Sequence, residues 1–180
     1  EEYDKLVSAY NALKGQVDDA SLLTALTAEI AAYKPAHIVL PQEGKTYQLV
    51  SASTYYKAKY AGSTVYCDGQ NIRFHYTPQV EPEELWQFKA EGNAFRLTNV
   101  LKNQQLVLSK TNGTNATLAE QGTMLTIALA TKASGKYTYV PGALTLGTSS
   151  TALLSADCTG YVKTGNNGAV CYPGTWFIVE

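Results

Sequence analysis

The side chains that usually carry acid–base, nucleophilic or metal chemistry are few in this chain. There are two histidines, His37 and His75, and three cysteines whose spacings match no zinc motif. His37 lies in the apolar run 36–40, where a packed imidazole is expected rather than a general base. The sequence therefore predicts no catalytic triad, no metal site and no bound cofactor.

One cluster of acids, formed by Glu81, Glu83 and Glu84, could supply the two carboxylates that a hydrolase needs. Such a pair requires apolar burial that raises the pKa of one carboxyl group. Adjacent acids around Pro82 in a loop are more typical of a solvated surface. The sequence therefore indicates a binding protein rather than an enzyme.

Residues 1–37 are expected to form an antiparallel α-helical hairpin. The first helix is expected to end at Gly15. The second helix is expected to begin near Asp19, which is a good N-cap residue, and to end at Pro35. Apolar residues recur at helical spacing in both segments, for example at Tyr10 and Leu26. A short hairpin cannot bury such a stripe alone, so we expect it to act as a spacer or as a docking element toward a neighbouring domain.

Residues 38–180 follow a different pattern, in which apolar residues alternate and turn residues recur at short intervals. Short strands are predicted at 47–50, 95–97 and 176–179. The segment 44–49 matches 92–97, and 134–139 is a looser third copy. Each copy is followed by a second strand-like run, at 63–66, 105–108 and 143–146. Three units of four short strands are therefore expected.

The segment that runs from Leu85-Trp86-Gln87-Phe88 through Gly92 and 95–99 to 106–109 resembles the repeat unit of β-trefoil domains of the ricin B type. Each repeat of that family carries a Trp or another bulky apolar residue in a Gln-x-Trp motif. Trp86 and Trp176 occupy this position in two copies, with Met124 in the third. The resemblance covers about residues 40–180. It implies a mainly β protein with a β-trefoil of three pseudo-repeats, in which these three residues are related core positions.

The resemblance also implies a sugar site in the first repeat. Lectins of this type place an Asp after the second strand, then an aromatic residue and the Gln of Gln-x-Trp. Here Glu84 stands where the Gln would be, and the other two repeats do not keep the pattern. A carboxylate, an amide and a Tyr suit the hydroxyls and the apolar face of a pyranose. The expected ligand-binding residues are Asp68, Asn71, His75, Tyr76 and Glu84.

Asp68 has a second interpretation. Asp68-Gly69 is a favoured hairpin turn, in which the Asp side chain satisfies its own backbone. The sequence leaves both roles open.

The pairing of the cysteines indicates whether the protein resides in an oxidising or a reducing compartment. Cys158 and Cys171 flank a turn-rich stretch at 165–168, as cross-strand partners in a hairpin would. If they pair, the closed loop contributes about 3 kcal/mol and indicates an oxidising compartment. Two buried, reduced thiols are the alternative. Cys67 is left unpaired in both cases.

Charge and hydropathy exclude some partners. The net charge is −1, from 14 basic and 15 acidic residues that are spread evenly, so no nucleic-acid surface is expected. No apolar run is long enough to span a bilayer, and no signal peptide is visible, so the sequence is interpreted as a mature or truncated chain. We expect an extracellular, periplasmic or cell-surface location.

The sequence is consistent with two functions. The first is a carbohydrate-binding, lectin-like accessory module of a larger exported bacterial protein, which binds a glycan or polysaccharide. The second is a protein-interaction or structural trefoil with no sugar site. A Tyr-lined loop at 52–62, with Tyr55, Tyr56 and Tyr60, favours the second.

Overall fold

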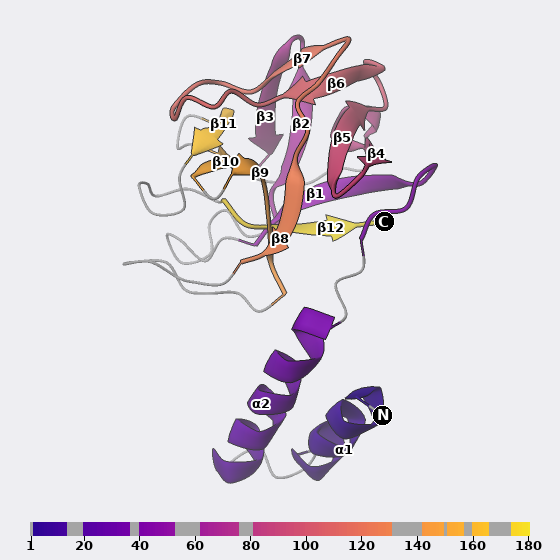
Figure 1. Ribbon diagram of the computed structural model, residues 1–180, viewed down its shortest axis with the longest axis vertical. Helices are drawn as coiled ribbons and strands as arrows, with labels where there is room; N and C mark the ends of the chain where they lie inside the picture. The colour runs from indigo at the N-terminus through magenta and orange to yellow at the C-terminus, as the bar shows by residue number, and fades with distance from the viewer. Residues whose placement is uncertain are drawn as a thin grey trace. The chain divides into compact units, whose positions relative to one another are not determined.

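In a computed structural model of the chain, the described residues are 2–13, 20–36, 40–52, 62–75, 81–130, 142–149, 151–156, 160–165 and 174–180. The internal contacts divide the chain into two compact units, Glu1–Leu40 and Pro41–Glu180. The first unit holds the helices and the second holds the strands (Figure 1).

The helical unit consists of α1 (Glu2–Leu13) and α2 (Ala20–Ala36), which pack against each other as a hairpin (Figure 1). Helix α2 extends one residue beyond the expected end at Pro35, and Gly15 and Asp19 lie outside the described residues. Tyr10 and Leu23 are more than half exposed, because two short helices cannot cover all of their apolar residues. None of the described helical segments has the length and apolar character needed to cross a bilayer.

The second unit is built from strands and one short 3-10 helix, η1 (Pro82–Glu84). Its described residues contain twelve strands: β1 (Thr46–Ser51), β2 (Thr64–Asp68), β3 (Asn71–His75), β4 (Trp86–Glu91), β5 (Ala94–Asn99), β6 (Gln104–Val107), β7 (Thr117–Ala119), β8 (Thr126–Leu129), β9 (Leu144–Ser149), β10 (Ala152–Ala156), β11 (Val162–Gly165) and β12 (Trp176–Val179). The predicted mainly β fold is confirmed.

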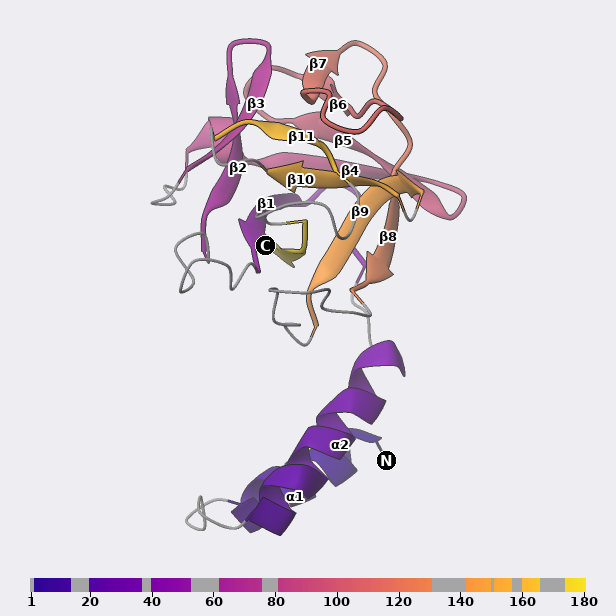
Figure 2. The ribbon, with the colours of Figure 1, turned by 90° about the vertical axis from the view of Figure 1, so that its left-hand side faces the viewer.

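The strands pair in three similar groups of four, β1–β4, β5–β8 and β9–β12, which we call quartets. In each quartet the first strand pairs with the second, and the second pairs with the third. The first strand also pairs with the last strand of the preceding quartet, as in β5 with β4, β9 with β8 and β1 with β12. Because β12 returns to β1, the ends of the sheet meet, and Figure 2 shows the strands wrapped around one interior.

The third quartet begins later than the sequence predicted. Strand β9 pairs with β8, β10 and β12, which is the pairing of a first strand, so 143–146 is not the second strand of its unit. The expected first copy at 134–139 lies outside the described residues. A glycine with positive φ precedes the first strand of each quartet; these glycines are Gly44, Gly92 and Gly142. The recurrence of glycine before each first strand is visible in the sequence and could have located the third quartet.

Two tryptophans fill the core at matching positions. Trp86 and Trp176 are completely buried, and their indole N–H groups donate to the carbonyl oxygens of Val65 (3.1 Å) and Leu154 (2.9 Å), which lie in second strands. A buried indole needs such a partner because an unpaired donor is costly to desolvate. Both tryptophans are therefore packing residues, as the sequence predicted.

Their counterpart in the second quartet is Leu125, and the prediction of Met124 is wrong by one residue. Tyr47 lies opposite Trp86, and Phe95 lies opposite Leu125 in the same way. Leu125 has no exposed surface, whereas Met124 is partly exposed. The alternation of a strand directs only one of two neighbours into the core, and the pairing register selects Leu125.

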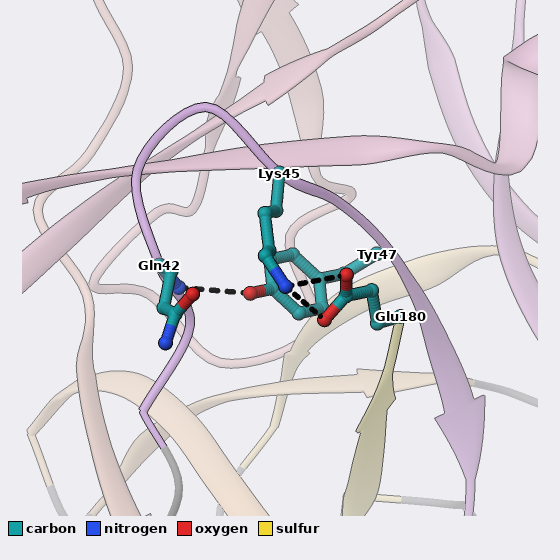
Figure 3. A network of polar contacts seen from close by, with 4 residues as sticks. All are labelled: Gln42, Lys45, Tyr47 and Glu180. Atoms are coloured by element: carbon teal, nitrogen blue, oxygen red, sulfur yellow. Dashed lines mark hydrogen bonds and ion pairs between the residues drawn. The ribbon is translucent and has the colours of Figure 1, made fainter.

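Polar contacts lie at the start of β1 and the end of β12, and one of them, between Lys45 and Glu180, joins the two strands (Figure 3). Lys45 Nζ lies 2.6 Å and 2.8 Å from the carboxylate oxygens of Glu180, and the backbone N–H of Gln42 donates to the Tyr47 hydroxyl at 2.9 Å. The hydrogen bond to Glu180 raises the pKa of Lys45. This exposed ion pair contributes little to stability, so the backbone pairing of β1 with β12 holds the two strands together.

Candidate functional site

The structure brings together two of the predicted ligand-binding residues. Asp68 ends β2 and Asn71 begins β3, and the two are directly opposite each other across a two-residue turn in which Gly69 has φ of 65°. Both are exposed. The Asp68 carboxylate accepts a hydrogen bond from Arg73 Nη1 at 3.2 Å. The hairpin turn that the sequence allowed is therefore present, and the Asp68 side chain is paired with Arg73.

The backbone of a third predicted site residue, His75, lies away from this pair. The backbone of His75 ends β3 opposite Thr64, about 13 Å along the strand from Asn71 at the usual rise per residue. Tyr76 lies outside the described residues.

Glu84 differs on two points from what its sequence context predicts. Its side chain has no exposed surface, and its Oε2 accepts a hydrogen bond from Gln48 Nε2 at 2.9 Å. The turn of η1 directs Glu84 inward, while Glu81 stays exposed and Glu83 is partly exposed. Glu84 is therefore neither a solvated surface acid nor a residue of an exposed sugar site.

Three residues that were not predicted from the sequence form a row that includes Arg73, the partner of Asp68. Tyr66 is directly opposite Arg73 in the β2–β3 hairpin, and Arg73 is bridged on its other side to Tyr161, just before β11. Opposite residues of paired strands share one face. The strand neighbours of Tyr66 and Arg73 are buried, so this face is the outer one; they are Val65, Cys67, Ile72 and Phe74. We call Tyr66, Arg73 and Tyr161 the Tyr–Arg row.

The row combines aromatic and charged groups at short distances. The guanidinium carbon of Arg73 lies 4.6 Å from the centre of the Tyr161 ring, within the range of a cation–π contact. Partial burial raises the pKa of Tyr66, so its hydroxyl stays protonated well above neutral pH. The arrangement offers two aromatic rings, a cation and a carboxylate on one outer surface.

Comparison with known proteins identifies the fold. No model of a protein family matches the sequence, and no curated protein matches it. A solved structure of a ricin B-like lectin from Macrolepiota procera, in complex with lactose, superposes with a TM-score of 0.62 at 17% identity, over 79% of this chain and 99% of that chain. The designed threefold-symmetric protein ThreeFoil superposes with a TM-score of 0.52 at 12% identity, over 75% and 98%. The chain has a β-trefoil fold.

The same trefoil fold also occurs within a larger enzyme. An endo-β-galactosidase from Clostridium perfringens that releases GlcNAcα1-4Gal superposes with a TM-score of 0.55 at 10% identity. The match covers 74% of this chain and 32% of the enzyme. Similar folds are thus found in a lectin and in one part of a glycosidase, and fold alone does not assign either activity.

The trefoil topology explains why the row was not visible in the sequence. Tyr66 and Arg73 belong to the first repeat, whereas Tyr161 belongs to the third. The signal for Tyr66 was available, because it alternates with the apolar residues Val65 and Cys67. Among the described residues, no group of three or more His, Cys, Asp or Glu side chains could hold a metal ion.

Proposed function

We propose that this trefoil is a non-catalytic carbohydrate-binding module that holds a sugar on the Tyr–Arg row. The observation that carries the proposal is the Asp68–Arg73 pair between two outward-facing tyrosines. A tyrosine ring packs on the apolar C–H face of a pyranose, while carboxylate, guanidinium and amide groups exchange hydrogen bonds with its hydroxyls. Asn71, exposed opposite Asp68, supplies the amide.

The wider setting is part of the same proposal. The module belongs to a larger exported bacterial protein, outside the cytoplasm, and the helical unit connects it to a neighbouring domain. The separation of Glu1–Leu40 from Pro41–Glu180 as compact units supports such a modular arrangement. The occurrence of a similar fold as 32% of the clostridial glycosidase supports it further.

The direct test is calorimetry after a glycan array, with plant, mucin and simple sugars. Tyr161→Ala is expected to weaken the best ligand at least tenfold, and Asp68→Ala to weaken it as well. Tyr10→Ala is the matched control, because Tyr10 is an exposed tyrosine of α1. If no glycan binds at millimolar concentration while circular dichroism shows a folded chain, the proposal is wrong.

A second candidate is a protein-interaction module. Val100 and Leu101 are exposed side by side in the turn that follows β5, and an apolar pair of this kind is often covered by a protein partner. The Tyr-lined loop that favoured this function lies largely outside the described residues, at 53–61. Leu101→Glu separates the two candidates, because it disrupts an apolar protein contact and leaves glycan binding unchanged.

A further inference from the structure

The Tyr–Arg row crosses three neighbouring segments of the trefoil, β2, β3 and the start of β11 (Figures 1 and 2). It runs as a line from Tyr66 through Arg73 to Tyr161. Because neighbouring strands are about 4.8 Å apart, the backbones of the two tyrosines are about 10 Å apart. Two aromatic side chains therefore flank one arginine over a distance that exceeds the length of one pyranose ring.

A second line of side chains runs beside the first on the same outer face. Asp68 lies opposite Asn71, and Asn71 is bridged to Thr117 of β7. We call Asp68, Asn71 and Thr117 the polar row; all three are exposed, and the neighbours of Thr117, Ala116 and Leu118, are buried. Along β2 and β3 the polar row is two residues from the Tyr–Arg row, which is a distance of about 7 Å. The outer face therefore carries an aromatic row and a hydrogen-bonding row side by side.

One guanidinium connects the two rows. Arg73 Nη1 donates to the Asp68 carboxylate at 3.2 Å, and the guanidinium carbon lies over one face of the Tyr161 ring. These contacts order the side chains before a ligand arrives, which lowers the entropy lost on binding. The charges of Arg73 and Asp68 also compensate each other, and the other members of the two rows are uncharged. The surface therefore favours a ligand without charge.

We propose that the two rows together bind an uncharged linear oligosaccharide of at least three sugar units. This inference rests on the proposed function and names the ligand class of the same site. Alternate units of an extended chain lie on Tyr66 and Tyr161, and the unit between them lies at Arg73. The tyrosine rings contact the apolar C–H faces of the sugars, while the polar row exchanges hydrogen bonds with the hydroxyls along one edge of the chain.

The test measures binding of the whole chain to uncharged β-1,4-linked oligosaccharides by calorimetry. Three series are used, built from galactose, xylose and mannose, and each runs from one to six units. In a series that binds, we expect the affinity to rise at least tenfold between one unit and three, because each added ring gains a contact on the two rows. Beyond four units the affinity should change less than twofold. Trigalacturonate is the charged comparison and should bind no more tightly than the neutral trisaccharides.

Variants locate the contact. Tyr66→Ala removes one aromatic platform, so the trisaccharide should then bind no more tightly than the disaccharide. Tyr66→Phe keeps the ring and should retain most of the gain with chain length. Thr117→Ala, in the polar row, should weaken the trisaccharide two- to threefold. The matched control is Tyr10→Ala, at an exposed tyrosine of α1, which should leave the whole series unchanged; circular dichroism checks that each variant is folded.

The outcomes separate this inference from the proposed function. A monosaccharide that binds as tightly as the trisaccharide overturns the inference, and if that binding depends on Tyr161 the proposed function still stands. A gain with chain length that persists in Tyr66→Ala places the added units elsewhere and also overturns the inference, as does tighter binding of trigalacturonate. If no oligosaccharide of the three series binds at millimolar concentration, the inference is wrong, and the glycan array then decides the proposed function separately.

Discussion

Arg73 of the first repeat lies opposite Tyr161 of the third, with its guanidinium carbon 4.6 Å from the centre of the tyrosine ring. The contact joins two hairpins that are distant in the sequence. It also holds the guanidinium over a partly exposed ring, beside the Asp68 carboxylate. This contact therefore connects two repeats of the trefoil at the candidate surface.

The first prediction concerns this contact. In a double-mutant cycle of Arg73→Gln and Tyr161→Ala, we expect a coupling energy of about 0.5–1 kcal/mol, typical of a cation–π pair at a partly exposed site. Urea unfolding of the four proteins measures it. Tyr161→Phe keeps the aromatic face and should preserve most of the coupling. A coupling energy of zero shows that the two side chains do not interact in solution.

The second prediction tests the register of the second repeat. Leu125→Ala is expected to lower the free energy of unfolding by about 2–5 kcal/mol, because it opens a cavity at a core position equivalent to that of Trp86. Met124→Ala, at the neighbouring and partly exposed position, should lower it by much less. Chemical denaturation of both variants makes the comparison. A larger loss for Met124→Ala than for Leu125→Ala contradicts the pairing of Leu125 with Phe95.

The third prediction concerns the buried acid. Glu84→Ala removes the acceptor for the Gln48 amide inside the protein, so we expect a loss of about 1–3 kcal/mol in unfolding free energy. The control is Glu81→Ala, an exposed residue that makes no side-chain capping bond to η1 and should change stability by about 0.5 kcal/mol or less. Similar small effects from both substitutions would argue against burial of Glu84.

The fourth prediction concerns Cys67, which is buried and unpaired, as the sequence analysis expected; Cys158 and Cys171 lie outside the described residues. Burial raises the pKa of the Cys67 thiol to about 12. Only about one thiol in ten thousand is then ionised at pH 8, and the thiolate is the reactive form. We expect iodoacetamide to leave Cys67 unmodified in the folded protein and to modify it in urea, as read by peptide mass spectrometry.

The same pKa shift has a consequence for stability. An unfolded thiol ionises near 9 and the folded one near 12, so unfolding releases this proton as the pH rises through that range. The contribution of Cys67 to stability is therefore complete below pH 9 and is lost progressively toward pH 12. Cys67→Ala should flatten the fall in unfolding free energy between pH 9 and 10.5 relative to the unmodified chain. An unchanged slope contradicts the shift.

Features that depend on local pattern were predictable. The helical periodicity of 1–37, the change to alternation after Ile38, and the burial of Trp86 and Trp176 all follow from the spacing of apolar residues. Asp68 and Asn71 were placed together because a two-residue turn brings its flanking residues opposite each other. Each of these conclusions needs only residues that are close in the sequence.

Features that depend on register and on long-range pairing were not predictable in the same way. Met124 and Leu125 differ by one position, and only the pairing with Phe95 shows which one is buried. Glu84 looks like a surface acid in the sequence, and only the inward turn of η1 beside Gln48 makes it a core residue.

The sequence by itself determined the classes of the elements, because a helix or a strand is encoded by the period of its own apolar residues. The tertiary structure alone decided that Tyr161 and Lys163 of the third repeat lie beside Arg73 of the first. The physical reason is that this neighbourhood forms only when three hairpins close around a common axis. No interval along the chain encodes a contact between strands that are about ninety residues apart, since the closure depends on the packing of the whole core.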